Sequence, residues 1–150
     1  NFRRRFFKNL INLIPISRKP NPESLDLDDT MTLSKAFMDL GNNIIIFPEG
    51  SRGEVGKIQR FRKGAVKFSM GLDVPILPAA IMGAEKAWPK GEKFIKPFPI
   101  TVKVLPKIDP PKTEELSKTA YNKALSKITK ELEIKISEAV KELEETKSPD

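Results

Sequence analysis

Cysteine and histidine are both absent from the 150-residue chain. The lack of cysteine excludes disulfides and thiolate metal sites. The lack of histidine removes the usual general base at neutral pH, the Ser-His and Cys-His nucleophile systems, and most transition-metal sites. We therefore expect no metal site, and the function classes that depend on histidine chemistry within these residues are excluded.

Long apolar runs are also lacking. No stretch approaches the roughly 20 residues that a membrane-spanning helix needs. A signal peptide would need a longer apolar stretch and a small-residue cleavage site, and neither is present. Asn1 stands where an initiator methionine would be expected, which we interpret as a fragment boundary, so that the fold is expected to be truncated at the N-terminus.

Charge is plentiful, with a formal net value of +7, and it is unevenly distributed. Six Lys/Arg and no acid occur in residues 1–20, whereas residues 21–49 carry one base and six acids. Residues 50–110 then carry twelve bases and five acids. This pattern suits an anionic partner such as phosphate, a membrane surface or nucleic acid, but a solvated basic surface is an equal alternative. Nucleic acid is the weakest of these, because the chain has one Trp, one Tyr and no recognisable nucleic-acid motif.

Apolar periodicity predicts an α/β domain over residues 1–150. A basic amphipathic helix is expected over 2–14, lying either on a membrane or on its own domain. Further helices are expected over 30–40, ended by Gly41, over 63–70, closed by Gly71, and over about 113–146 as one long amphipathic C-terminal helix. The buried candidates in the second helix are Met31, Leu33, Phe37, Met38 and Leu40.

Three short apolar segments predict strands. Residues 43–47 form a continuous β-branched run that suits a buried strand of a parallel sheet. Residues 74–81 suit a strand that Pro75 and Pro78 force to an edge or interrupt, because each proline removes a ladder donor. Residues 100–105 alternate apolar and polar positions and suit a third strand with one wetter face.

The first of these strands delivers a turn, Pro48-Glu49-Gly50, followed by Arg52. Ligands of open α/β sheets gather outside the carboxyl ends of strands, so a site is expected here. Gly50 lets the backbone approach a ligand closely, and Arg52 offers a planar bidentate donor for phosphate. Glu49 can orient that guanidinium or accept a substrate hydroxyl. Taken bare, such a turn is more often a loop with a surface charge.

Four motifs in order change that interpretation. FPEGSR at residues 47–52 resembles the FPEGTR signature of the glycerol-phosphate and lysophosphatidic-acid acyltransferases, with Ser51 in place of Thr. FRKGA at 61–65 resembles the family's F-K-x-G-A segment, and VPILP at 74–78 resembles its V-P-I-x-P block. IPISR at 14–18 resembles a block that ends in Asp-Arg, with Ser17 in place of Asp. The resemblance covers about residues 1–110.

This resemblance implies a glycerol-3-phosphate acyltransferase-like fold, with a mixed sheet flanked by helices. It implies transfer of a fatty acyl group from acyl-CoA or acyl carrier protein, with no further cofactor, to 1-acyl-glycerol 3-phosphate (lysophosphatidic acid). The substrate phosphate would be held by residues of the signature and of the upstream block, namely Glu49, Gly50, Ser51, Arg52 and Arg18. Arg62 and Lys63 are possible additional phosphate or donor contacts, and Val74, Pro75, Ile76 and Pro78 would shape the acyl site.

The family's catalytic histidine, in a His-x4-Asp motif that lies upstream of all these motifs, has no counterpart here. The resemblance therefore implies that the 150-residue chain alone is inactive. It also implies association with the cytoplasmic side of a membrane. The alternative function is a non-catalytic module that binds anionic lipid through Arg3 to Arg5 and the basic loop, without dependence on Glu49.

Trp88 lies in a segment that leaves two interpretations open. It can anchor at a membrane interface, where amphipathic rings are enriched, or lie partly buried under the preceding strand. Phe94, Pro97, Phe98 and Pro99 extend an apolar, proline-rich loop that belongs either to an acyl-chain path or to a membrane contact.

Overall fold

The computed structural model describes residues 27–51 and 57–146 of the chain. These residues belong to two compact units, Asn1–Ile45 and Ile46–Asp150. The helix expected over 2–14 lies outside the described residues. The prediction of a single domain over residues 1–150 stays a prediction.

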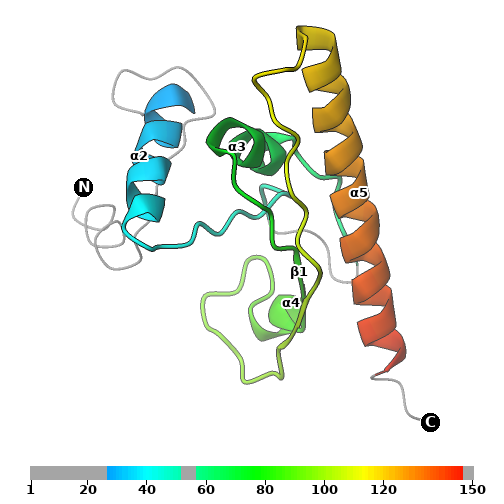
Figure 1. Ribbon diagram of the computed structural model, residues 1–150. Helices are drawn as coiled ribbons and strands as arrows, with labels where there is room; N and C mark the ends of the chain where they lie inside the picture. Colours follow the sequence, from blue (N-terminus) through cyan, green and yellow to red (C-terminus); the bar gives the residue numbers. More distant parts are fainter. Residues whose placement is uncertain (1–26, 52–56, 147–150) are drawn as a thin grey trace. The chain divides into compact units, whose positions relative to one another are not determined.

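The described part of the first unit is helix α2, Leu27–Asp39 (Figure 1). Asp28 and Asp29 lie in its first turn, where negative charge stabilises the helix dipole. The helix begins three residues before the start and ends one residue before the end of the predicted span 30–40. Gly41 follows as the expected cap, with a φ of 82° that only glycine adopts readily and an N–H that bonds the Met38 carbonyl at 2.8 Å. Leu40, predicted to be buried, is instead exposed, because it follows the last helical residue.

The strand predicted over 43–47 is wrong for the described residues. This segment is extended but forms no ladder there, and Ile45 and Phe47 are 81% and 70% exposed. A buried strand needs hydrogen-bonding neighbours on its edges and layers over its faces, and the described residues supply neither. Apolar content alone therefore does not specify a strand at residues 43–47.

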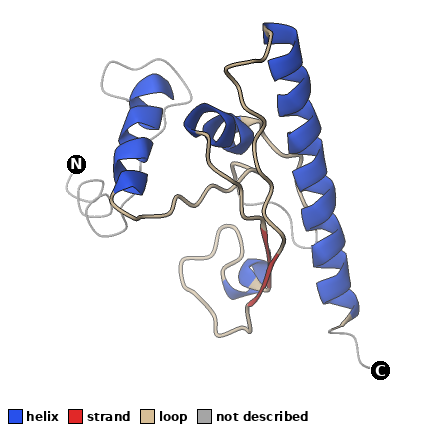
Figure 2. Cartoon of the chain, viewed as in Figure 1, coloured by secondary structure: helices blue, strands red, loops and turns tan. Residues whose placement is uncertain are grey.

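Among the described residues of the second unit, the sheet is a two-stranded antiparallel pair, β1 (Ala79–Met82) and β2 (Thr101–Val104), drawn in red in Figure 2. β2 lies within the strand predicted over 100–105, and β1 overlaps the strand predicted over 74–81 and ends one residue beyond it. Ala80 and its partner Lys103 face helix α5, Lys118–Glu145, which packs on β1. On the opposite face the pair Ile81 and Val102 is exposed.

Proline interrupts the ladder before β1, as the sequence predicts. Ile76 and Ile108 form an isolated bridge through two backbone bonds of 2.9 and 2.8 Å. Pro78 follows on the same side of the strand, and its carbonyl accepts a bond from the Leu105 N–H at 2.9 Å. Pro78 cannot return a bond because it has no N–H, so the ladder breaks between the bridge and β1.

Helix α3, Gly64–Leu72, runs two residues beyond its predicted end. Gly71 is helical, and Asp73 takes the left-handed cap position with φ of 51°. The Ser69 hydroxyl donates to the Val74 carbonyl at 2.6 Å, so the exit of the helix is fixed by side-chain chemistry.

The long C-terminal helix is confirmed as α5, although it begins at Lys118 and not near residue 113. Ser117 caps it by accepting a bond from the Ala120 N–H at 3.2 Å, the usual role of serine at a helix start. α5 packs on α3 and on β1, beside which it runs in Figure 1. The core between these elements contains Phe61, Val66, Met70, Ile108, Leu125 and Leu132.

A one-turn helix that the sequence did not predict, α4 (Ala84–Ala87), follows β1 directly. Gly83 is its N-cap, with a backbone φ of 93°. None of the helices described, α2 to α5, has the length and apolarity to cross a bilayer.

Candidate functional site

Residues 47–51, called here the Glu49 turn, are held in a fixed shape. The Gly50 N–H closes the turn onto the Phe47 carbonyl at 3.0 Å. The Arg62 N–H bonds the Pro48 carbonyl at 2.9 Å, so residues 57–63, called here the returning segment, run back alongside the turn. Predicted site residues separated by more than ten positions are thereby brought together.

Glu49 is held by a backbone group from the returning segment. Its Oε2 accepts a hydrogen bond from the Gln59 N–H at 2.9 Å, and the Ser51 hydroxyl lies 3.4 Å from the Gln59 side-chain oxygen. A carboxylate–amide bond of this kind is charge-assisted and therefore short and directional. Glu49 is half-buried, so one of its two oxygens fixes its orientation while the turn still borders solvent.

Arg62 lies across the turn at Gly50. A β-carbon placed on Gly50 would meet the Arg62 side chain, 2.9 Å from Nε and 3.4 Å from the central guanidinium carbon. Gly50 has φ of 72°, which L side chains rarely adopt, so the position requires glycine for its backbone and for the space that Arg62 uses. The exposed Arg62 side chain therefore lies against Gly50, the residue between Glu49 and Ser51, and its role as an additional phosphate contact stays a prediction.

The returning segment is anchored from behind by α5. The N–H of the buried Phe61 donates to Glu133 Oε2 at 3.0 Å. This bond, followed by the one from Lys130, holds the pKa of Glu133 below its ordinary value. Lys63 donates to the Ser126 hydroxyl at 2.8 Å, so its ammonium is directed to α5 in this structure.

The segment predicted to shape an acyl site lies in the bridge region before β1. Val74 and Ile76 are half-buried, Pro78 is buried, and Pro75 is exposed. Ile76 packs against the core cluster that also contains Phe61 and Ile108. This segment and the segment that contains Phe61 therefore border one core. The acyl-site role of Val74, Pro75, Ile76 and Pro78 stays a prediction.

Two of the predicted phosphate contacts, Arg52 and Arg18, lie outside the described residues. Two residues that the sequence analysis did not single out belong to the site's support, namely Gln59 and Glu133. Gln59 offers its backbone, which no side-chain pattern reveals. Glu133 lies 72 positions from Phe61, so no local signal pointed to it.

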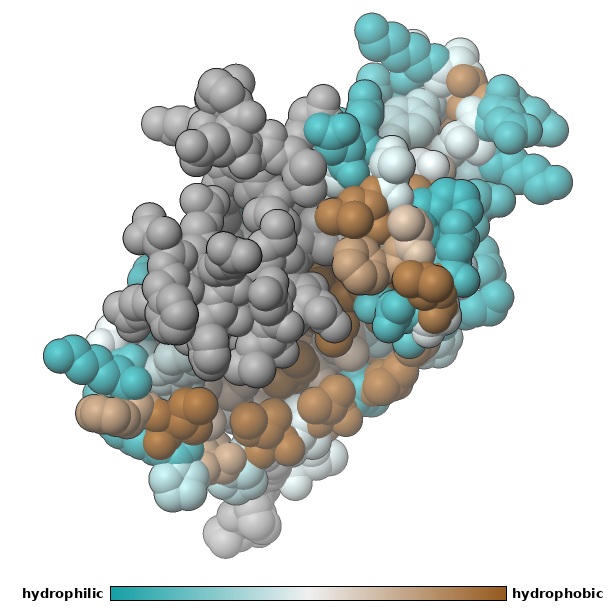
Figure 3. Space-filling view, turned by 90° about the vertical axis from the view of Figure 1, so that its left-hand side faces the viewer, coloured by the Kyte–Doolittle hydropathy of each residue, from teal (hydrophilic) through white to brown (hydrophobic). Residues whose placement is uncertain are grey.

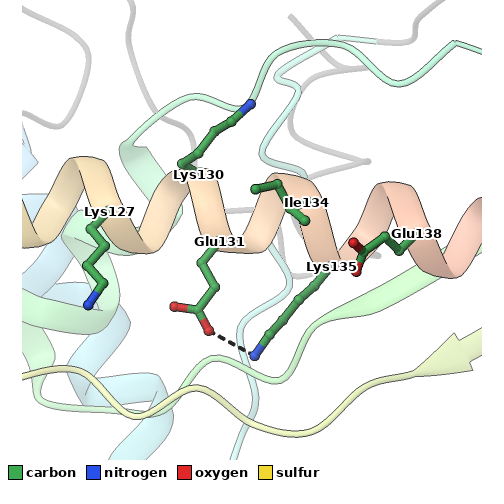
Figure 4. Close-up of a pocket in the computed structure, with 6 residues that line it drawn as sticks. All are labelled: Lys127, Lys130, Glu131, Ile134, Lys135 and Glu138. Atoms are coloured by element: carbon green, nitrogen blue, oxygen red, sulfur yellow. Dashed lines mark ion pairs between the residues drawn. The ribbon is translucent and has the colours of Figure 1, made fainter.

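A hollow of about 480 Å³ lies elsewhere, on the outer face of α5 (Figure 4). All six residues that line it come from that helix: Lys127, Lys130, Glu131, Ile134, Lys135 and Glu138. Glu131 and Lys135 pair across it at 2.8 Å. A depression lined by one helix cannot surround a ligand, and it is separate from the Glu49 turn.

Comparison with known families gives a match to the model described as "Acyltransferase" over residues 2–82. Among curated proteins, a 1-acyl-sn-glycerol-3-phosphate acyltransferase of Limnanthes douglasii is 42% identical over 67 residues, which are 45% of this chain and 24% of that protein. The enzyme of the same name from Cocos nucifera is 31% identical over 104 residues, covering 69% of this chain and 32% of the relative. The chain thus spans about a quarter to a third of these relatives.

A solved structure also resembles the chain. The 1-acyl-sn-glycerophosphate acyltransferase of Thermotoga maritima matches with a TM-score of 0.56 and 24% identity, over 81% of this chain and 47% of the other. At this identity the likeness concerns the fold, and it confirms the α/β acyltransferase-like fold class predicted from the motifs. The family match includes the signature turn at residues 47–52.

Proposed function

Because the chain belongs to the acyltransferase family, we propose that the protein transfers a fatty acyl group to the free hydroxyl of 1-acyl-glycerol 3-phosphate. The donor is acyl-CoA or acyl carrier protein, and the product is phosphatidic acid. The enzyme acts at the cytoplasmic surface of a membrane, where both its acceptor and its product reside. The relatives from Limnanthes douglasii and Cocos nucifera carry this activity in their names, which supports the proposal.

One observation carries the proposal: the fold brings Glu49, Ser51 and Arg62 together at the signature turn. A guanidinium gives two parallel donors to a phosphate, and Ser51 adds a hydroxyl. In this proposal Arg62 and Arg52 bind the phosphate of the acceptor. Glu49, oriented by the Gln59 N–H, accepts a hydrogen bond from the glycerol part and fixes its position.

Acyl transfer also requires a general base that removes the proton of the attacking hydroxyl. The chain has no histidine, so the general base that the family resemblance assigns to a His-x4-Asp motif is not among these residues. General acid–base assistance is worth roughly 10²- to 10⁴-fold in rate. We therefore propose that the 150-residue chain binds the acceptor but shows no measurable acyl transfer by itself.

The test is acyl transfer to lysophosphatidic acid by the full reading frame, by the 150-residue chain, and by full-frame Arg52→Ala and Arg52→Lys. We expect activity in the full frame only, with kcat/KM reduced roughly 10- to 100-fold in Arg52→Ala because a charge-assisted bond is lost. Arg52→Lys keeps the positive charge but loses the two parallel donors of the guanidinium, so it should retain only part of the activity. Robust turnover by the 150-residue chain would contradict the proposal.

The second candidate, a non-catalytic anionic-lipid-binding module, is favoured by the net charge of +7. It predicts lipid binding that weakens with salt and does not change in Glu49→Gln. The exposed Glu114 gives a matched control, because Glu114→Gln makes the same charge change away from the turn. Loss of acyl transfer by full-frame Glu49→Gln but not by full-frame Glu114→Gln supports the enzyme. Absence of acyl transfer in every form, together with lipid binding that weakens with salt, supports the module.

A further inference from the structure

The loop that joins β1 to β2, residues 83–100 and called here the Trp88 loop, exposes its apolar side chains while its backbone is held in place. Phe94 and Ile95 are 80% and 70% exposed, and Trp88 is 45% exposed. Figure 3 shows apolar residues exposed on one face of the described chain. Exposed apolar side chains that gather in one segment favour an interaction site, whereas single scattered ones are ordinary.

Four exposed lysines lie in the same loop as these side chains. They are Lys86, Lys90, Lys93 and Lys96, against two acids, Glu85 and Glu92. Glu85 is engaged by the Gly83 N–H at 2.9 Å, and Glu92 pairs with Lys96 at 3.3 Å. The loop therefore carries a net positive charge together with its exposed apolar side chains.

The shape of the loop is set by bonds within it. The Lys96 N–H bonds the Ala87 carbonyl at 2.8 Å, and Trp88 Nε1 donates to the Glu92 carbonyl at 2.9 Å. Lys86 lies over the ring of Phe98, 5.3 Å from its centre. These contacts hold the base of the loop, so Phe94 and Ile95 are presented from a formed scaffold.

We infer that the Trp88 loop is a membrane-docking surface that inserts Phe94 and Ile95 into an anionic lipid bilayer while its lysines bind the head groups. Lysine beside apolar residues favours a bilayer over a protein partner, because the cores of protein interfaces are depleted of lysine whereas lysine stems snorkel at membranes. An amphipathic indole such as Trp88 also suits the interface. The inference rests on the proposed function in its choice of a bilayer, where the acceptor lipid resides.

The chain reports on this loop directly, because Trp88 is its single tryptophan. The experiment adds vesicles of phosphatidylcholine and phosphatidylglycerol in equal parts to the 150-residue chain, and phosphatidylcholine vesicles in parallel. We expect a saturable blue shift of Trp88 fluorescence with the mixed vesicles and a much weaker one with phosphatidylcholine alone. Vesicle binding without any change in Trp88 emission would overturn the inference, since another part of the chain would then hold the membrane.

Matched variants separate insertion from general charge. Phe94→Ser with Ile95→Ser should weaken vesicle binding at least about tenfold, whereas Ile134→Ser, an exposed apolar position on α5, should change it less than about twofold. Lys90→Gln with Lys93→Gln should weaken binding roughly tenfold, and Lys123→Gln with Lys127→Gln, the same charge change on α5, by no more than about twofold. Equal losses in the loop and helix variants would refute a dedicated surface.

Failure of this inference and failure of the proposed function give different results. Acyl transfer by the full reading frame, measured with the acceptor in detergent micelles, does not need a bilayer. The Phe94→Ser and Ile95→Ser variant should keep that activity within about twofold while it loses vesicle binding. No acyl transfer in the unsubstituted full frame would reject the function and leave the vesicle result standing.

Discussion

The Glu49 turn and the Trp88 loop are both irregular segments, yet they are fixed in different ways. The Glu49 turn depends partly on side chains, since Glu49 holds Gln59 and Arg62 lies against Gly50. The Trp88 loop has side-chain contacts too, but at its base backbone meets backbone directly, since Gly83 lies against the Pro99 carbonyl and the Lys96 N–H bonds the Ala87 carbonyl. Side-chain contacts can rearrange around a ligand, whereas backbone contacts cannot without moving the chain. The Glu49 turn therefore suits a binding site, and the Trp88 loop suits a rigid support for exposed side chains.

Gly83→Ala is expected to have the largest effect. Its β-carbon would overlap the Pro99 carbonyl oxygen, and its φ of 93° is strained for alanine. We expect a loss of about 3 kcal/mol in the free energy of unfolding, measured by urea denaturation. Gly91→Ala is the control, because its φ is 96° but nothing lies within 4 Å, so only the strain of about 1 kcal/mol remains. Equal losses would contradict the backbone contact.

Gly50→Ala should cost less, about 1–2 kcal/mol, because the obstructing atoms belong to the flexible Arg62 side chain. The double variant Gly50→Ala with Arg62→Ala should recover the steric part and leave the strain. A double-mutant cycle in urea measures this coupling. If the losses in unfolding free energy of the two single variants add in the double variant, Arg62 does not constrain Gly50. The Glu49 turn would then depend less on side-chain contacts, and it would differ less from the Trp88 loop.

Glu49→Ala tests the side-chain support of the turn. It removes the acceptor of the Gln59 N–H, and we expect a loss of about 1 kcal/mol, since the half-buried amide can bond water instead. Faster hydrogen exchange at the Gln59 amide is the direct readout. Unchanged exchange would show that another group holds this amide.

The smallest effect concerns Glu133, which anchors the returning segment to α5. Its folded-state pKa is lowered from 4.5, chiefly by the Phe61 N–H, so its stabilisation is present above that value and is lost as pH falls through the lowered folded-state pKa. We expect Glu133→Gln to reduce stability by less than about 1 kcal/mol at neutral pH, and the difference to shrink in acid. Urea denaturation across this pH range measures it; a difference that grows in acid would have the wrong sign.

Much of the fold followed from the sequence where local signals suffice. The regular apolar spacing of α5, the proline that breaks the ladder before β1 and the glycine after α2 each act within a few residues. The strand expected at 43–47 failed because a strand depends on neighbours that its own sequence does not encode. At the site, the signature predicted Glu49 and Ser51, but the role of Gln59 arises from chain geometry that no motif contains.

Helix α5 has a consequence for the order of events during synthesis. It supplies Leu125 and Leu132 to a core whose other members, such as Phe61 and Met70, lie more than fifty positions earlier. Its bond to Phe61 spans 72 positions. Since a ribosome delivers the chain from its N-terminus, the earlier residues must wait with their apolar side chains uncovered until α5 emerges. The second unit is therefore expected to complete its packing late, with α5 as the closing element and the nascent chain as a client for chaperones until then.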